Sequence, residues 1–121
     1  MRDLNIVLTV PDAERLRGAL TLAAAQAALG GHATLFLQLD AVGLLRAHTS
    51  APCDAAHQAA GLPDLATLIV EAQDMGVTLI ACQSGMALSD LTANDLPAGV
   101  EIGGPIGFLQ HTDDAARLLI A

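Results

Sequence analysis

The chain has 121 residues, which fits a single folded domain spanning residues 1–121. Hydrophobic residues make up 53% of it and the mean hydropathy is +0.51, which excludes an intrinsically disordered chain. The formal net charge is −8, with five arginines and no lysine, so we expect no nucleic-acid partner and no lysine-based chemistry.

Nothing in the sequence indicates a membrane protein or an exported one. No apolar run approaches the roughly 20 residues of a membrane-spanning helix, so we expect no membrane span. The residues Met1 to Asn5 lack the layout of a signal peptide. Two cysteines without an export signal are typical of reduced thiols, which favours a cytoplasmic location.

The first third of the chain predicts a strand, a long helix and a second strand. Leu4–Val10 is apolar and β-rich at its centre, which is typical of a buried strand. A helix is expected from Pro11 to about Leu29, because its apolar residues fall on one helical face and two glycines end it. Ala33–Leu37 predicts the second strand.

The middle of the chain predicts two helices separated by a loop. Asp40–Ala47 is expected to form a short helix. His48–Gly61 is rich in Ala, Ser, His and Pro and shows no clear period, so we expect a loop with at most one helical turn. This loop is the segment best suited to act as a lid or to face a partner. Pro63 is typical of a first helical position, and its helix is expected to run to about Met75.

The last part of the chain continues the alternation of strands and helices. Val77–Ala81 predicts a strand, Ser84–Leu91 a short helix, and Val100–Ile102 another strand that leads into a helix. Ala116–Ala121 could form a fifth strand or the end of that helix. The alternation predicts an α/β fold, a small doubly wound, mostly parallel five-stranded sheet with helices on both faces.

Cys82 is the strongest candidate for a reactive group. It follows an apolar strand and precedes a helix start, so we expect it at the carboxyl edge of the sheet, where open α/β folds bind ligands. A helix that begins beside a thiol favours its ionised, reactive form. Gln83, Ser84 and Gly85 offer backbone N–H groups with little steric cover, and we expect the sulfur to lie open to solvent or a partner. The alternative is a buried structural cysteine, because free cysteines pack as small hydrophobic residues.

The second thiol and the histidines give weaker signals. Cys53 could resolve a disulfide formed by Cys82 or pass sulfur onward. No neighbouring residue in the sequence would activate its thiol, so a loop cysteine without a chemical role is the better interpretation. His48, Cys53 and His57 lie close together in the sequence, yet they lack the Cys-x-x-Cys pair typical of a soft-metal site. His32 and His111 are expected to be solvated surface residues.

The glycine-rich segment Gly103–Gly107 follows a predicted strand and opens a helix. Its amides could bind an anion, although it lacks the G-x-G-x-x-G spacing of a dinucleotide site. Close packing of the strand and the helix is the alternative explanation for these glycines. We expect Gly103 and Gly104 to share a sheet edge with Cys82 and to help wall its pocket.

Two segments resemble a known family. Gly61–Leu91, with Leu-Ile-Ala-Cys-Gln-Ser-Gly-Met-Ala-Leu at its centre, and Val100–Gly104 with the following helix resemble the DsrE/DsrF-like family, in particular its branch labelled peroxiredoxin-like. The resemblance implies a small α/β domain that assembles into homo-oligomers, often trimers or hexamers. It also implies that Cys82 carries sulfur as a persulfide and that the partners are other sulfur carriers or rhodanese-like enzymes.

The function we predict from the sequence is therefore a sulfur carrier or a sulfurtransferase-like protein. Persulfide transfer needs a thiolate and room for one added sulfur atom, and it requires no metal or organic cofactor. With Cys82 as the sulfur-carrying residue, the residues predicted to line its pocket are Gln83, Ser84, Gly85, Met86, Gly103 and Gly104. Two alternatives stay open: a non-catalytic oligomeric scaffold in which Cys82 is structural, and a small-molecule or anion binder that uses the Gly103–Gly107 loop.

Overall fold

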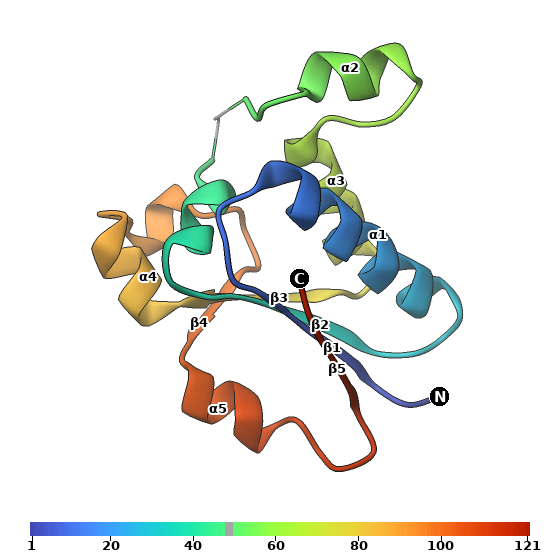
Figure 1. Cartoon of the computed structure of the whole chain (residues 1–121), viewed down its shortest axis with the longest axis vertical. Helices are drawn as coiled ribbons and strands as arrows, with labels where there is room; N and C mark the ends of the chain where they lie inside the picture. Colours follow the sequence, from blue (N-terminus) through green and yellow to red (C-terminus); the bar gives the residue numbers. More distant parts are fainter. Residues whose placement is uncertain (48–49) are drawn as a thin grey trace.

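The computed structural model describes residues 1–47 and 50–121 (Figure 1). Within these residues a five-stranded sheet forms from β1 (Leu4–Leu8), β2 (Ala33–Leu37), β3 (Thr78–Cys82), β4 (Glu101–Gly103) and β5 (Arg117–Ile120). All neighbouring strands are parallel, and their order is β4-β3-β2-β1-β5. The chain therefore builds the sheet outward from β1 to β4 and then returns to the other side of β1, which confirms the predicted α/β fold.

Helices lie on both faces of this sheet. They are α1 (Ala13–Ala28), α2 (Asp54–Ala59), α3 (Leu65–Asp74), α4 (Gln83–Leu88) and α5 (Pro105–Gln110), with the 3-10 helices η1 (Leu39–Leu45) and η2 (Ala93–Asp95). Figure 1 shows α1 and α3 on one face of the sheet, α5 on the other, and α4 beside the end of β3. Among the described residues, no helix combines the length and the apolar character needed to cross a membrane.

The core is formed by the strands and the helix faces that cover them. All five residues of β1 are buried, and so are Leu35 and Leu37 of β2, because a parallel sheet with helices on both sides has no solvated face at its centre. α1 contributes Leu16 and Leu20, which have no exposed surface. On the other face, the rings of Phe36 and Phe108 stack with their centroids 5.0 Å apart, so α5 is anchored to the sheet through an aromatic pair.

Several boundaries differ from the prediction for local reasons. β1 ends at Leu8 instead of Val10, because the chain turns there into the N-cap of α1, where the Asp12 side chain accepts hydrogen bonds from two backbone N–H groups. The segment expected to be a loop with at most one helical turn contains α2. The predicted helix Asp40–Ala47 is a 3-10 helix. Of the two alternatives left open for Ala116–Ala121, the fifth strand is the one that forms, because β1 offers a free edge for pairing.

Candidate functional site

Cys82 lies at the junction of a strand and a helix. It is the last residue of β3 and the N-cap residue of α4, and its backbone is extended, with φ −68° and ψ 127°. The predicted position of the thiol is therefore confirmed. Residues in register across a parallel sheet lie on the same face, and residues two apart on a strand do so as well. Because Ile80 is in register with Phe36, Cys82 lies on the face of the sheet that carries α5.

The expectation that the sulfur lies open at the rim of the sheet is wrong for the isolated chain. Cys82 is only 2% exposed and belongs to the hydrophobic core cluster. The reason is tertiary: α4 turns back after the strand and packs against both η1 and β3. The end of β3 is therefore enclosed, although the sequence pattern predicts a residue that is open to solvent at the carboxyl edge of the sheet.

Gly85 allows the close packing of α4 on η1. A Cβ atom on this residue would lie 2.0 Å from the carbonyl oxygen of Leu39 and 2.7 Å from Cγ2 of Val42. No real side chain fits at the first of these distances, so the two helices touch backbone to backbone only because this residue is glycine. Leu39 itself has φ +51°, in the left-handed region that leucine rarely adopts.

The residues predicted to line a pocket around Cys82 have different environments. Gln83 and Ser84 are exposed at the start of α4, whereas Gly85 and Met86 are buried against the fold. The cavities that we describe below are lined by other residues. The role of these four side chains in a pocket therefore stays a prediction.

The two glycines predicted to share the edge with Cys82 lie beside it. Gly103 is the register partner of Cys82 on β4, and Gly104 is the N-cap residue of α5. A Cβ atom on Gly103 would approach only Cγ2 of Ile80, at 3.2 Å, and one on Gly104 would meet nothing within 4 Å. The position beside Gly103 is therefore already filled by Ile80, and only Gly104 borders open space.

The first turn of α4 has no side-chain cap. An N-cap side chain normally accepts a hydrogen bond from the second or third N–H group of the helix. At this helix the N-cap residue is Cys82, and its side chain makes no such bond. These N–H groups are consequently available to a negatively charged group at the position of the sulfur.

The family model described as the DsrE/DsrF-like family matches residues 3–120. The chain belongs to the DsrE/DsrF-like family. Members of this family are linked to sulfur relay, and the resemblance predicted from two segments is confirmed over nearly the whole chain. A comparison with curated protein sequences finds no match.

Two solved structures have the same fold as this DsrE/DsrF-like chain. One is a protein of unknown function, MTH1491, from Methanobacterium thermoautotrophicum, with a TM-score of 0.74, 14% sequence identity and 100% of both chains covered. The other is a conserved protein of unknown function, BT1422, from Bacteroides thetaiotaomicron, with a TM-score of 0.68 and 18% identity over 98% of this chain and 94% of that one. At such identities the likeness shows the shared fold alone.

The second thiol of the DsrE/DsrF-like chain is the exposed one. Cys53 precedes α2 with φ +67°, and it forms no disulfide with Cys82. Of the three residues considered as a metal site, His48 lies outside the described residues, and Nε2 of His57 contacts Oε1 of Glu14 at 2.8 Å. In the part of the chain that the structure describes, no three His, Cys, Asp or Glu side chains gather closely enough to hold a metal.

An ion pair of a buried arginine that the sequence analysis missed ties α1 to the start of α2. Arg17 is 4% exposed, and its Nη2 donates to the backbone oxygen of Pro52 at 2.7 Å and to Oδ1 of Asp54 at 2.8 Å. Its Nε donates to Oε1 of Glu14 at 2.8 Å. The one signal in the sequence is an arginine next to Leu16, on the face of the helix that is otherwise apolar.

The carboxylate of this pair also organises the backbone around it. Asp54 accepts hydrogen bonds from the N–H groups of Ala51 and Leu65 at 2.8 and 3.0 Å. The hydrogen bond from Arg17, followed by these backbone bonds, lowers the pKa of Asp54 to about 2. Because the folded pKa is lowered, the stabilisation by this group is present at neutral pH and is lost only as the pH falls from about 4 through about 2.

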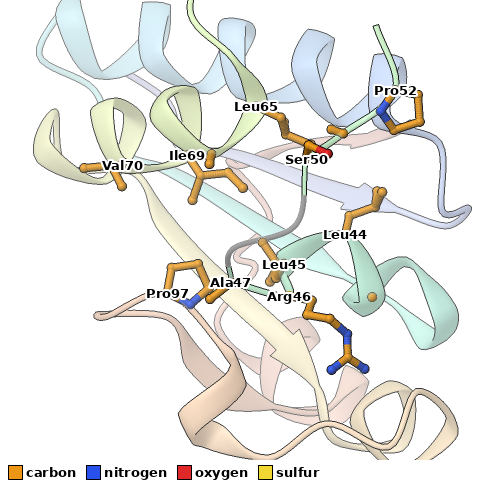
Figure 2. A pocket seen from close by; sticks show the side chains of 13 residues that line it. Leu44, Leu45, Arg46, Ala47, Ser50, Pro52, Leu65, Ile69, Val70 and Pro97 are labelled. Atoms are coloured by element: carbon orange, nitrogen blue, oxygen red, sulfur yellow. The ribbon is translucent and has the colours of Figure 1, made fainter. Parts of the chain in front are cut away.

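An apolar cavity of about 280 Å³ lies between the end of η1 and α3 (Figure 2). Figure 2 shows Leu65 and Ile69 of α3 on one side and Leu45 of η1 on the other. Arg46 also lines it, but its guanidinium group donates to the backbone oxygen of Ser89 at 3.1 Å. The lining offers mainly aliphatic contacts and contains no thiol, so this cavity is separate from the strand end that carries Cys82.

Proposed function

We propose that this chain is a cytoplasmic sulfur carrier that accepts one sulfur atom on Cys82 as a persulfide and passes it to a protein partner. The observation that carries the proposal is the thiol at the junction of β3 and an uncapped helix, in a member of a family linked to sulfur relay. The partners that we propose are other sulfur carriers and rhodanese-like enzymes.

The transfer is a thiol exchange at sulfur. The Cys82 thiolate attacks the outer sulfur of a donor persulfide, the donor's S–S bond breaks, and the donor leaves as a thiolate. The proton of the Cys82 thiol goes to solvent, and the reverse sequence delivers the sulfur atom to an acceptor. No external oxidant is needed, because one S–S bond breaks as another forms. A persulfide needs room for one more sulfur atom, so loading requires the residues that enclose Cys82 to move.

The burial of Cys82 adds a requirement to this mechanism. A donor reaches the sulfur only when a covering segment moves, and the segment that we propose is α4, moving away from η1. It has six residues, and its Leu88 is 69% exposed. Short elements of this kind open at lower cost than the whole domain unfolds.

Single-thiol variants test the carrier proposal. Cys53→Ser leaves Cys82 as the only thiol, and Cys82→Ser leaves Cys53 as the matched exposed control. After incubation with glutathione persulfide, we expect Cys53→Ser to gain about 32 Da, the mass of one sulfur atom, and to transfer it to an acceptor thiol. Cys82→Ser is expected to transfer none. A Cys53→Ser protein that stays unloaded with several persulfide donors contradicts the proposal.

We also propose that the chain forms a homo-oligomer, a trimer or a hexamer, through the edge of the sheet at β5. All four residues of β5 are exposed, including Leu118, Leu119 and Ile120. A hollow of about 730 Å³ lies between β5 and α1, where Leu22 is also exposed. Unpaired strand edges and exposed apolar patches both favour association.

The oligomer is checked by light scattering of the purified chain, whose mass is 12.3 kDa. We expect a particle of three or six chains, and we expect Ile120→Asp to dissociate it because a charge would be placed on the interface. Leu29→Asp is the matched control, since Leu29 is exposed at the far end of α1. A monomer at micromolar concentration, or equal dissociation by both substitutions, contradicts the proposed interface.

A second candidate function is supported by the burial of Cys82. A thiol buried in the core cluster is typical of a structural cysteine. The same structure is therefore expected for an oligomeric scaffold in which Cys82 carries no sulfur. The two functions differ in whether Cys82 can be reached without global unfolding of the domain. The rate measurement described in the Discussion separates them.

A further inference from the structure

Cys82 is closely surrounded in the folded chain. It is 2% exposed and belongs to the hydrophobic core cluster. On the neighbouring strand, a Cβ atom on Gly103 would already meet Cγ2 of Ile80 at 3.2 Å, so an existing side chain fills this position. Neither of the cavities described above includes Cys82 in its lining. A second sulfur atom on this residue therefore overpacks the closed form of the chain.

The contact between α4 and η1 limits the direction in which α4 makes room. α4 begins directly after Cys82, and a Cβ atom on its Gly85 would lie 2.0 Å from the carbonyl oxygen of Leu39. Packed backbone cannot yield by changing a rotamer, so an added atom moves α4 away from η1 and not toward it. Near the other end of α4, the exposed Arg46 donates to the backbone oxygen of Ser89 at 3.1 Å, and this movement breaks that bond.

The other helix near this sulfur, α5, is held more firmly. It covers the face of the sheet on which Cys82 lies, and its Phe108 ring stacks on Phe36. Just after α5, the hydroxyl group of Thr112 donates to the backbone oxygen of Phe108 at 3.0 Å and accepts from Nδ2 of Asn5 at 3.0 Å. An aromatic pair and a hydrogen-bonded link to β1 thus fix α5, so α4 is the cover that yields first.

α4 is a short segment between two anchored points. Of its six residues, Gly85 and Met86 are the buried ones, and the N-cap side chain makes no hydrogen bond to its first turn. After the helix the backbone turns at Asp90, with φ +52°, and Leu91 re-enters the core at 7% exposure. The helix can therefore shift while Cys82 and Leu91 keep their places.

We propose that the persulfide itself holds α4 away from η1, so that the loaded and the empty carrier have different surfaces. This inference rests on the proposed function, because it concerns a sulfur atom carried by Cys82. The closed form is overpacked by the added atom and the open form is not, so loading shifts the population toward the open form. The coupling is reciprocal, and a change that opens α4 also favours loading.

The acceptor protein then distinguishes a loaded carrier from an empty one. Movement of α4 uncovers the part of η1 that Gly85 meets, including Val42, which has no exposed surface in the closed form. An acceptor with an apolar side chain fits this uncovered surface and binds the loaded form. Once the sulfur atom has been transferred, α4 closes again and the acceptor is released, so the empty carrier does not compete for it.

Hydrogen exchange followed by NMR on Cys53→Ser, loaded and empty, tests this inference. The sulfur atom is placed on Cys82 in urea with glutathione persulfide, the chain is refolded by dilution, and a gain of about 32 Da gives the loaded fraction. The amides of Ser89 and Leu91 bond to the backbone oxygens of Gly85 and Met86. We expect loading to lower their protection roughly tenfold.

The amides of Leu16 and Leu68, at the starts of α1 and α3, serve as internal controls and should keep their protection. The matched variant is Cys82→Ser loaded on Cys53, where the same sulfur atom at an exposed position should leave α4 unchanged. In Gly85→Ala the helix is already displaced, so loading should change its protection less than about twofold.

Three results overturn the inference. They are unchanged protection of α4 with the sulfur atom in place, an equal loss of protection at Leu16 and Leu68, and a loaded chain that does not refold. Because the sulfur atom is attached to the unfolded chain, none of these results depends on whether the native chain accepts sulfur. Failure of the proposed function is seen separately, as a native Cys53→Ser protein that stays unloaded.

Discussion

In the native protein, we expect Cys82 to react with iodoacetamide at least about 100-fold more slowly than Cys53. The reason is that Cys82 is 2% exposed, whereas Cys53 is an exposed residue. A reagent reaches a buried thiol only through an open form of the protein, and an opening free energy of about 3 kcal/mol lowers the rate roughly 100-fold. The rates are measured by mass spectrometry on Cys53→Ser and Cys82→Ser, each of which keeps one thiol.

The denaturant dependence of the slow rate distinguishes the carrier from the scaffold. If α4 opens locally, low concentrations of urea barely change the rate at Cys82, because little surface is exposed in the opening. If Cys82 is only a packed core residue, the rate rises with urea as steeply as global unfolding does. A rate at Cys82 equal to that at Cys53 would mean that the thiol is not enclosed in solution.

The substitution Gly85→Ala is expected to have the largest effect on stability. The new Cβ atom would lie 2.0 Å from the backbone oxygen of Leu39, so α4 or η1 must move. Overpacking of this kind typically lowers the free energy of unfolding by roughly 1–3 kcal/mol, and here the obstacle is backbone, which cannot rotate away. Urea unfolding followed by circular dichroism measures it, because the chain has no Trp or Tyr for fluorescence. We also expect faster alkylation of Cys82 in this variant, since α4 is displaced.

The matched control for Gly85→Ala is Gly107→Ala. Gly107 also lies inside a six-residue helix, and a Cβ atom there meets nothing within 4 Å. Alanine is a better helix former than glycine, so this variant should gain roughly 0.5–1 kcal/mol in the free energy of unfolding. The two substitutions are compared at the same protein concentration, because association shifts apparent stability. If Gly85→Ala is as stable as Gly107→Ala, the contact between α4 and η1 is not as close as described.

The strands and the long helix were predictable because their signals are local. A parallel strand that is covered on both faces consists of a short run of apolar residues, and such runs predict β2 and β3 in the sequence. The start of α1 follows from Asp12, whose side chain caps the helix within the next few residues. The alternation of these elements is enough to predict a parallel α/β sheet, and the place of Cys82 at the end of β3 follows from the same pattern.

The surroundings of the candidate sites depend on contacts between distant parts of the chain. Cys82 is enclosed in the core cluster only in the folded chain, and the packing of α4 against η1 requires Gly85 to meet the backbone of Leu39. Arg17 and Asp54 are ordinary charged residues when considered singly, and only the fold brings their side chains within 2.8 Å of one another.

The sequence by itself therefore determined the class of fold, the family and the position of the thiol along the chain. The tertiary structure alone decided that this thiol is covered, that Arg17 pairs with Asp54, and that Gly85 meets the backbone of Leu39. The physical reason is that periodicity and capping act over a few neighbouring residues. Burial and side-chain pairing depend on which distant surfaces meet once the sheet has formed.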